Sequence, residues 1–133
     1  MKLQINKETR IRDVQKKFTE VYPFLKIEFY KKPHAEKKLS SISDRISSEE
    51  VLSKVGNFTK FENINLNKRR TVAEFESEFY KKTGVAIQVS RRAGNIWIET
   101  SITDDRTLGM QNKQGKIASS TNVDFLMEED IGS

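Results

Sequence analysis

The sequence predicts one α+β domain in which a strand-helix-strand unit occurs twice. The 133 residues are a normal length for a single domain. Residues 2–32 and 63–92 share one hydrophobic pattern at an offset of 61 residues, with a gap of one residue after the helix. In both segments apolar residues alternate with polar ones, recur at helical spacing, and then alternate again. The repeat therefore predicts two copies of one supersecondary unit.

The first unit starts with a strand at Leu3 and Ile5, where apolar and polar residues alternate. A helix is expected next, with Thr9 as its N-cap and an end after Tyr22, because Pro23 cannot continue it. A second strand around residues 25–30 completes the unit. The apolar positions of the helix are Ile11, Val14, Phe18 and Val21.

The second unit has the same order of elements, and its helix has clear boundary signals. Thr71 and Glu74 have the spacing of a capping box, and Gly84 is a suitable helix stop. After the last strand of this unit, Gly94-Asn95 predicts a hairpin turn that leads into an extra strand at residues 95–101. The apolar positions are Ile64, Leu66, Val72, Phe75, Phe79, Ile87 and Val89.

The remaining segments are an insert and a C-terminal extension. Within the insert, residues 33–62, we expect a mobile loop at 37–43 and a short helix at 47–55. A short helix is expected to begin near Thr103 and to end near Gly115. The domain is thus predicted to span 1–115. Residues 116–133, which combine acidic and apolar residues, are predicted to form a flexible acidic tail.

Two strand-helix-strand units interleave most simply into one antiparallel sheet with both helices on one face, the ferredoxin-like arrangement. A β-grasp-like roll is the alternative, because the 30-residue insert leaves the pairing of the second and third strands open. The repeat, with segments 22–29 and 95–100, resembles small uncharacterised bacterial domains over residues 1–115. That resemblance implies a fold and no activity.

Alternation also assigns the two faces of the predicted sheet. Ile96 and Ile98, like the apolar positions of the other strands, should point toward the helices. The opposite face should be polar with two aromatic residues, and we interpret it as a protein-binding face. Its candidate residues are Tyr30, Trp97, Lys26, Gln88 and Glu99.

The net charge of +5 is unevenly distributed, since residues 93–133 carry 3 basic and 7 acidic side chains. The basic residues concentrate at predicted strand ends and form two rims beside helix N-termini, where phosphates could bind. Nucleic-acid or other polyanion binding is therefore the competing hypothesis. The first rim comprises Lys7, Arg10, Lys31 and Lys32, and the second comprises Lys68, Arg69, Arg70, Arg91 and Arg92.

Catalysis has little support in the sequence. Without cysteine and with His34 as the only histidine, the chain cannot build a thiolate metal site, a multi-histidine site or a cysteine nucleophile. It also lacks phosphate-binding and dinucleotide-binding glycine motifs. We expect a non-catalytic, cytoplasmic protein without a cofactor, without a metal and without a membrane segment, which binds an unknown protein partner through the open sheet face or an edge strand.

Overall fold

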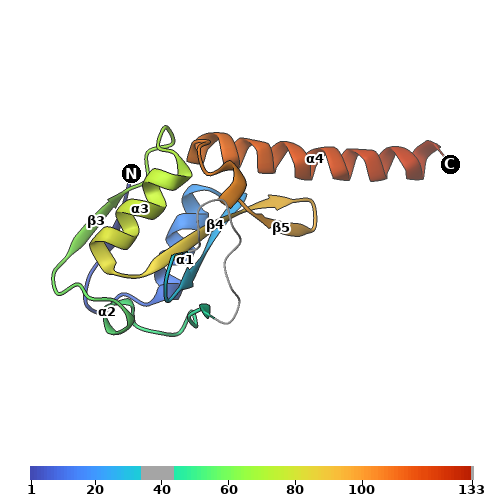
Figure 1. Ribbon diagram of the computed structural model, residues 1–133. Coiled ribbons are helices and arrows are strands. Elements are labelled where there is room, and N and C mark those ends of the chain that lie inside the picture. The colour runs from blue at the N-terminus through green and yellow to red at the C-terminus, as the bar shows by residue number, and fades with distance from the viewer. Residues whose placement is uncertain (34–43, 133) are drawn as a thin grey trace.

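The computed structural model describes residues 1–33 and 44–132, with side chains up to residue 120. The chain is an α+β protein (Figure 1). A short 3₁₀ turn, Ser101–Thr103, precedes the last helix. The elements in chain order are β1 (Lys2–Ile5), α1 (Ile11–Val21), β2 (Leu25–Tyr30), α2 (Leu52–Val55), β3 (Glu62–Asn65), α3 (Val72–Thr83), β4 (Ala86–Ala93), β5 (Ile96–Glu99) and α4 (Leu108–Gly132).

The described strands form two antiparallel sheets instead of the predicted single sheet. One contains β1 and β3, and the other has the order β2-β4-β5. A ferredoxin-like sheet would need β2 and β4 to flank the β1–β3 pair, so that arrangement is not confirmed, and neither is the β-grasp-like roll. The insert explains part of the difference, because a segment of that length between β2 and β3 removes the tight hairpin that would join them.

Equivalent elements of the two repeat units lie next to each other. β1 pairs with β3 so that Leu3 stands opposite Ile64, and β2 pairs with β4 so that Glu28 stands opposite Gln88. The alignment of the two repeat units matches the same residues, Leu3 with Ile64 and Glu28 with Gln88. Both halves thus contain strand, helix and strand at the predicted positions, whereas their common origin by duplication stays a prediction.

The hydrophobic core joins the two halves through their helices. Phe18 of α1 stacks on Phe75 of α3 with ring centroids 5.3 Å apart, and Phe29 of β2 meets Phe79 of α3 edge-on at 5.4 Å. Such aromatic pairs add to the free energy gained from burying their area. The largest fully buried side chains are Phe18, Phe29, Phe75, Phe79, Leu3, Ile5, Ile11, Leu25, Ile27, Leu52, Ile64 and Leu66.

The end signals of α3 are confirmed, whereas the start of α1 differs from the prediction. Thr71 Oγ1 accepts the Glu74 N–H at 3.1 Å, and the Glu74 carboxylate accepts the Thr71 N–H at 3.0 Å. Gly84 ends α3 with φ 75°, a conformation that favours glycine. At α1 the N-cap is Arg10, not Thr9, and its N–H donates to Asp13 Oδ2 at 2.9 Å. Thr9 Oγ1 instead accepts the Asn6 N–H.

Both predicted short helices have different bounds in the structure. In the insert, Leu52–Val55 is the only α-helical segment among the described residues, and the predicted loop at 37–43 lies outside the described residues. The C-terminal helix α4 begins at Leu108 and continues through Gly115 to Gly132 (Figure 1). The predicted tail therefore includes helical backbone, although its side chains beyond residue 120 lie outside the described residues, and its flexibility stays a prediction.

Candidate protein-binding surface

Two of the five residues predicted to lie on the open sheet face are buried. Tyr30 is 3% exposed and Gln88 is 1% exposed. The Tyr30 side chain forms a hydrogen bond with Arg45, which pairs with it across an isolated bridge next to β2. Gln88 Nε2 donates to the Val89 carbonyl at 2.8 Å. These two side chains therefore lie inside the described fold and are not displayed to a partner.

The other three residues of the predicted face come together near β5. Lys26 Nζ lies 4.9 Å from the centroid of the Trp97 ring, a cation–π contact, and Trp97 is 38% exposed. Glu99 pairs with Ser90, and Ser90 in turn pairs with Lys26, so Lys26 and Glu99 belong to one row across the sheet. Lys26, Trp97 and Glu99 thus form a half-exposed cluster at one end of the sheet.

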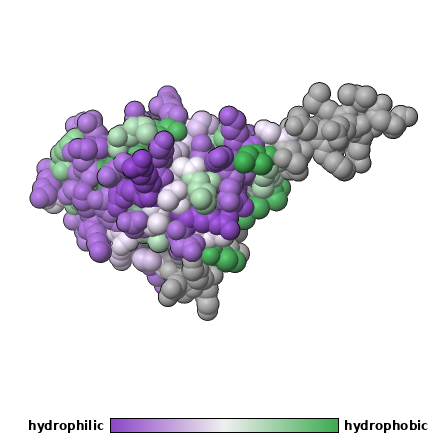
Figure 2. Space-filling view, turned by 90° about the horizontal axis from the view of Figure 1, so that it is seen from above, coloured by the Kyte–Doolittle hydropathy of each residue, from purple (hydrophilic) through white to green (hydrophobic). Residues whose placement is uncertain are grey.

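Ile96 and Ile98 lie on the predicted face of the sheet, but they are exposed and not covered by the helices. They are 61% and 41% exposed, although they lie on the same face of the sheet as the buried residues Ile27 and Val89. β5 projects beyond α1 and α3, which pack against β2 and β4 (Figure 1). Trp97 points to the opposite face of the strand. We call the exposed side chains of Ile96, Trp97 and Ile98, on the two faces of β5, the β5 surface. Seen from above, hydrophobic side chains gather at the end of the body where β5 projects (Figure 2).

Helix α4 packs beside the β4–β5 hairpin. Gly115 lies so close to the start of β2 and to β4 that an added Cβ would be 2.9 Å from Phe24 Cβ and 3.1 Å from Arg91 Cγ. The Phe24 N–H donates to Asn112 Oδ1 at 2.8 Å, and the Gly94 N–H at the hairpin turn donates to Ser119 Oγ at 3.3 Å. The first half of α4 therefore fixes the turn of the hairpin and leaves Ile96, Trp97 and Ile98 exposed.

Described residues of the insert interrupt the first predicted basic rim. Arg10 Nη1 donates to the Glu49 carbonyl at 2.6 Å, and the Lys31 N–H donates to the Asp44 carbonyl at 3.0 Å. Acidic residues of the insert thus lie among the four bases. Lys7, Lys31 and Lys32 are exposed.

Part of the second predicted rim, namely Lys68, Arg70 and Arg91, lies beside the first turns of α4. The Leu108 and Gly109 N–H groups donate to the carbonyls of Arg70 and Lys68, and Arg91 Nη1 donates to Gln114 Oε1 at 3.0 Å. Gln114 Oε1 also accepts Arg106 Nη1 at 2.8 Å. Lys68, Arg69 and Arg92 are exposed, as are three bases that the sequence analysis missed, because only the docking of α4 brings them here. They are Arg106, Lys113 and Lys116.

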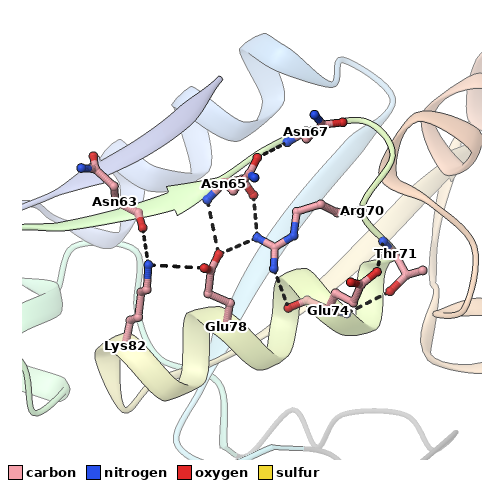
Figure 3. A network of polar contacts seen from close by, with 8 residues as sticks. All are labelled: Asn63, Asn65, Asn67, Arg70, Thr71, Glu74, Glu78 and Lys82. Atoms are coloured by element: carbon pink, nitrogen blue, oxygen red, sulfur yellow. Dashed lines mark hydrogen bonds and ion pairs between the residues drawn. The ribbon is translucent and has the colours of Figure 1, made fainter.

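Arg70 of that rim belongs to a polar network along the outer edge of β3 (Figure 3). Its Nη1 donates to Glu78 at 2.5 Å and to the Asn65 carbonyl at 3.0 Å. Glu78 also accepts the Asn65 N–H at 3.3 Å, and Lys82 Nζ donates to the Asn63 carbonyl at 2.8 Å. Side chains of Arg70 and α3 therefore occupy the Asn63 carbonyl and both backbone groups of Asn65 on the outer edge of this strand, which hinders its pairing with another chain.

The pKa of Glu78 lies below its ordinary value of 4.5. Partial burial raises this pKa, but the hydrogen bond and charge of Arg70, with contributions from Lys82 and the Asn65 N–H, outweigh burial and lower it. A carboxylate whose pKa is lowered on folding stabilises the native state at a pH above its unfolded pKa. That stabilisation is lost as the pH falls through the folded pKa.

We therefore expect the unfolding free energy of Glu78→Gln to depend less on pH in the acidic range than that of the wild type. Between about pH 6 and about pH 3 the wild type should lose more unfolding free energy than the variant, because only the wild type must protonate this carboxylate. Urea denaturation at both pH values measures the difference. Equal losses in the two proteins would show that the Glu78 charge does not contribute to stability.

The described residues contain no candidate metal site and no candidate membrane span. No group of three or more His, Asp or Glu side chains in this part of the chain could hold a metal ion. Within the same residues, no helix combines the length and the apolar character that crossing a membrane requires. His34 lies outside the described residues.

Comparison with known proteins adds no further assignment. No family model, no curated protein and no solved structure matches this chain.

Proposed function

We propose that this protein is a non-catalytic interaction module that binds a partner protein through the β5 surface. The observation that carries this proposal is the exposure of three apolar side chains on the last strand of a sheet, with Ile96 and Ile98 on one face of the strand and Trp97 on the other. Exposed apolar patches on monomeric proteins often mark interaction sites. Tryptophan is also among the residues that most often dominate the binding energy of an interface.

The structure around β5 supports a surface that is already formed before the partner arrives. The turn of the hairpin is held by the Gly94–Ser119 hydrogen bond, and Lys26 sits over one face of the Trp97 ring. A preformed surface loses little conformational entropy on binding, so more of the burial free energy becomes affinity. Basic side chains near the start of α4 favour a partner with acidic residues around an apolar centre.

Photo-crosslinking on the full-length chain tests the proposal. A benzophenone amino acid in place of Trp97 should yield a covalent adduct with one partner protein in lysate of the source cells. The same amino acid in place of Phe61, which is 52% exposed before β3, is the matched control. A dominant adduct that forms only from position 97 supports the proposal. Adducts of the same partner from both positions, or from position 61 alone, would place the binding site elsewhere.

Polyanion binding is the second candidate, and the gathering of bases at the start of α4 favours it. Lys68 and Arg69 lie beside the start of α4, which contributes Lys113, and Arg106 lies just before this helix. Binding to a nucleic acid through such a cluster would weaken steeply with salt, because each neutralised phosphate releases counterions. Affinity for a nucleic acid that is independent of salt concentration would exclude this role for the cluster.

A further inference from the structure

The outer edge of β1 differs from that of β3, its equivalent in the repeat. In the antiparallel β1–β3 pair, Leu3 lies opposite Ile64, and the Leu66 N–H donates to the Met1 carbonyl. Because inward and outward backbone groups alternate along an edge strand, the N–H and C=O groups of Lys2 and Gln4 point away from β3. Among the described residues, no hydrogen bond occupies these outward groups of Lys2 and Gln4.

Sequence differences between the two units account for this open edge. Arg70, Glu78 and Lys82 cover the outer edge of β3. At an offset of 61 residues, the corresponding positions in the first unit are Thr9, Lys17 and Val21. None of these three can repeat the network, because Thr9 is engaged with Asn6, Lys17 has no acceptor atom and Val21 is apolar.

The outer edge of β2 is also covered. Gln15 Nε2 and Thr19 Oγ1, both from α1, donate to the carbonyls of Ile27 and Leu25 at 2.9 and 3.1 Å. The Ile46 N–H donates to the Phe29 carbonyl at 2.8 Å. Side chains of α1 and α3 thus cover the edges of β2 and β3, whereas α1 leaves the β1 edge uncovered.

A shallow hollow of about 420 Å³ lies along the β1 edge, and its lining is Lys2, Gln4 and Lys17. All three residues are exposed, and two of them are cationic. Among the described residues, no carboxylate lines the hollow. Lysines on an edge strand oppose unselective pairing, since an approaching strand without negative charge would leave their ammonium groups poorly solvated. A strand that carries carboxylates would pair with both lysines instead.

We propose that the outer edge of β1 binds an extended acidic segment of a partner protein, which adds as a strand to the β1–β3 sheet. The outward N–H and C=O groups of Lys2 and Gln4 form the main-chain hydrogen bonds, and Lys2 and Lys17 select carboxylates on the added strand. This site involves residues other than the β5 surface. Its success or failure is therefore independent of the function proposed for that surface.

Two capped hexapeptides serve as probes, Ac-Glu-Val-Glu-Val-Glu-Val-amide and its lysine analogue, with the full-length protein. Amide exchange is followed by nuclear magnetic resonance. The acidic peptide should slow exchange of the Lys2 and Gln4 N–H groups in the wild type, and the lysine peptide should not. Equal protection by both peptides, or protection confined to other amides, would overturn the proposal.

The deciding variant is Lys17→Glu, with Lys16→Glu as its matched control. The introduced carboxylate would occupy the position that is equivalent to Glu78 and could accept the Gln4 N–H, so the change both closes the edge and reverses one charge. Lys16 is exposed on the same helix, and its replacement changes the net charge equally without reaching the edge. We expect Lys17→Glu to weaken binding of the acidic peptide at least about tenfold and Lys16→Glu less than about threefold. Equal weakening by the two variants would reduce the effect to net charge and contradict the proposal.

Discussion

Replacing Phe75 by alanine should lower the free energy of unfolding by about 3–5 kcal/mol, because the change leaves a cavity at the centre of the core. Phe75 is fully buried, and the centroid of its ring lies 5.3 Å from the ring centroid of Phe18 and 6.4 Å from that of Phe79. These contacts connect α1 of the first unit with α3 of the second. The loss should therefore affect both halves together, as one cooperative unfolding transition.

Urea denaturation followed by far-ultraviolet circular dichroism measures this effect. Phe61→Ala is the control, because Phe61 is an exposed phenylalanine and its loss should change stability by less than about 0.5 kcal/mol. If Phe75→Ala lost less than about 1 kcal/mol, or if two separate transitions appeared, the two units would not share the core described above.

The elements with local signals could be predicted from the sequence. The Thr71–Glu74 capping box and the Gly84 stop lie at the two ends of α3, because these motifs depend only on neighbouring residues. The hairpin between β4 and β5 also forms at Gly94-Asn95, where Gly94 has φ 66°. Local hydrogen bonds and backbone preferences are sufficient to specify such features.

The arrangement of the sheets could not be predicted in the same way. Alternation shows which residues of a strand share a face, but it carries no information about which strand lies beside it or which layer covers that face. Ile96 and Ile98 therefore match the pattern of core residues although no described element covers them. Tyr30 and Gln88 fit the pattern of a polar outer face although they are buried.

Gly115 shows a second limit of sequence patterns. A glycine after a short helical segment indicates a helix end, yet α4 continues through this position. The structure gives the reason, because a Cβ at Gly115 would approach Phe24 Cβ to 2.9 Å. This glycine permits close packing of a helix on a strand, and only the tertiary contact distinguishes that role from a helix stop.

The double variant Ile96→Asp with Ile98→Asp should weaken partner binding at least about a hundredfold. Full burial of one isoleucine side chain contributes about 1.5–3 kcal/mol, and each ~1.4 kcal/mol corresponds to a factor of ten in affinity. Two buried carboxylates without partners would add a further cost. Because both side chains are exposed in the free protein, the variant should keep the wild-type fold and stability within about 1 kcal/mol.

The most direct test of the β5 surface is the affinity of this double variant for the partner captured by the Trp97 crosslink. Titration calorimetry with the purified partner compares wild type, the double variant and Phe61→Asp, whose aspartate replaces an exposed apolar residue elsewhere. We predict at least about a hundredfold higher Kd for the double variant and a wild-type Kd for Phe61→Asp. A wild-type Kd for the double variant, with its fold intact, would contradict the assignment of the β5 surface as the binding site.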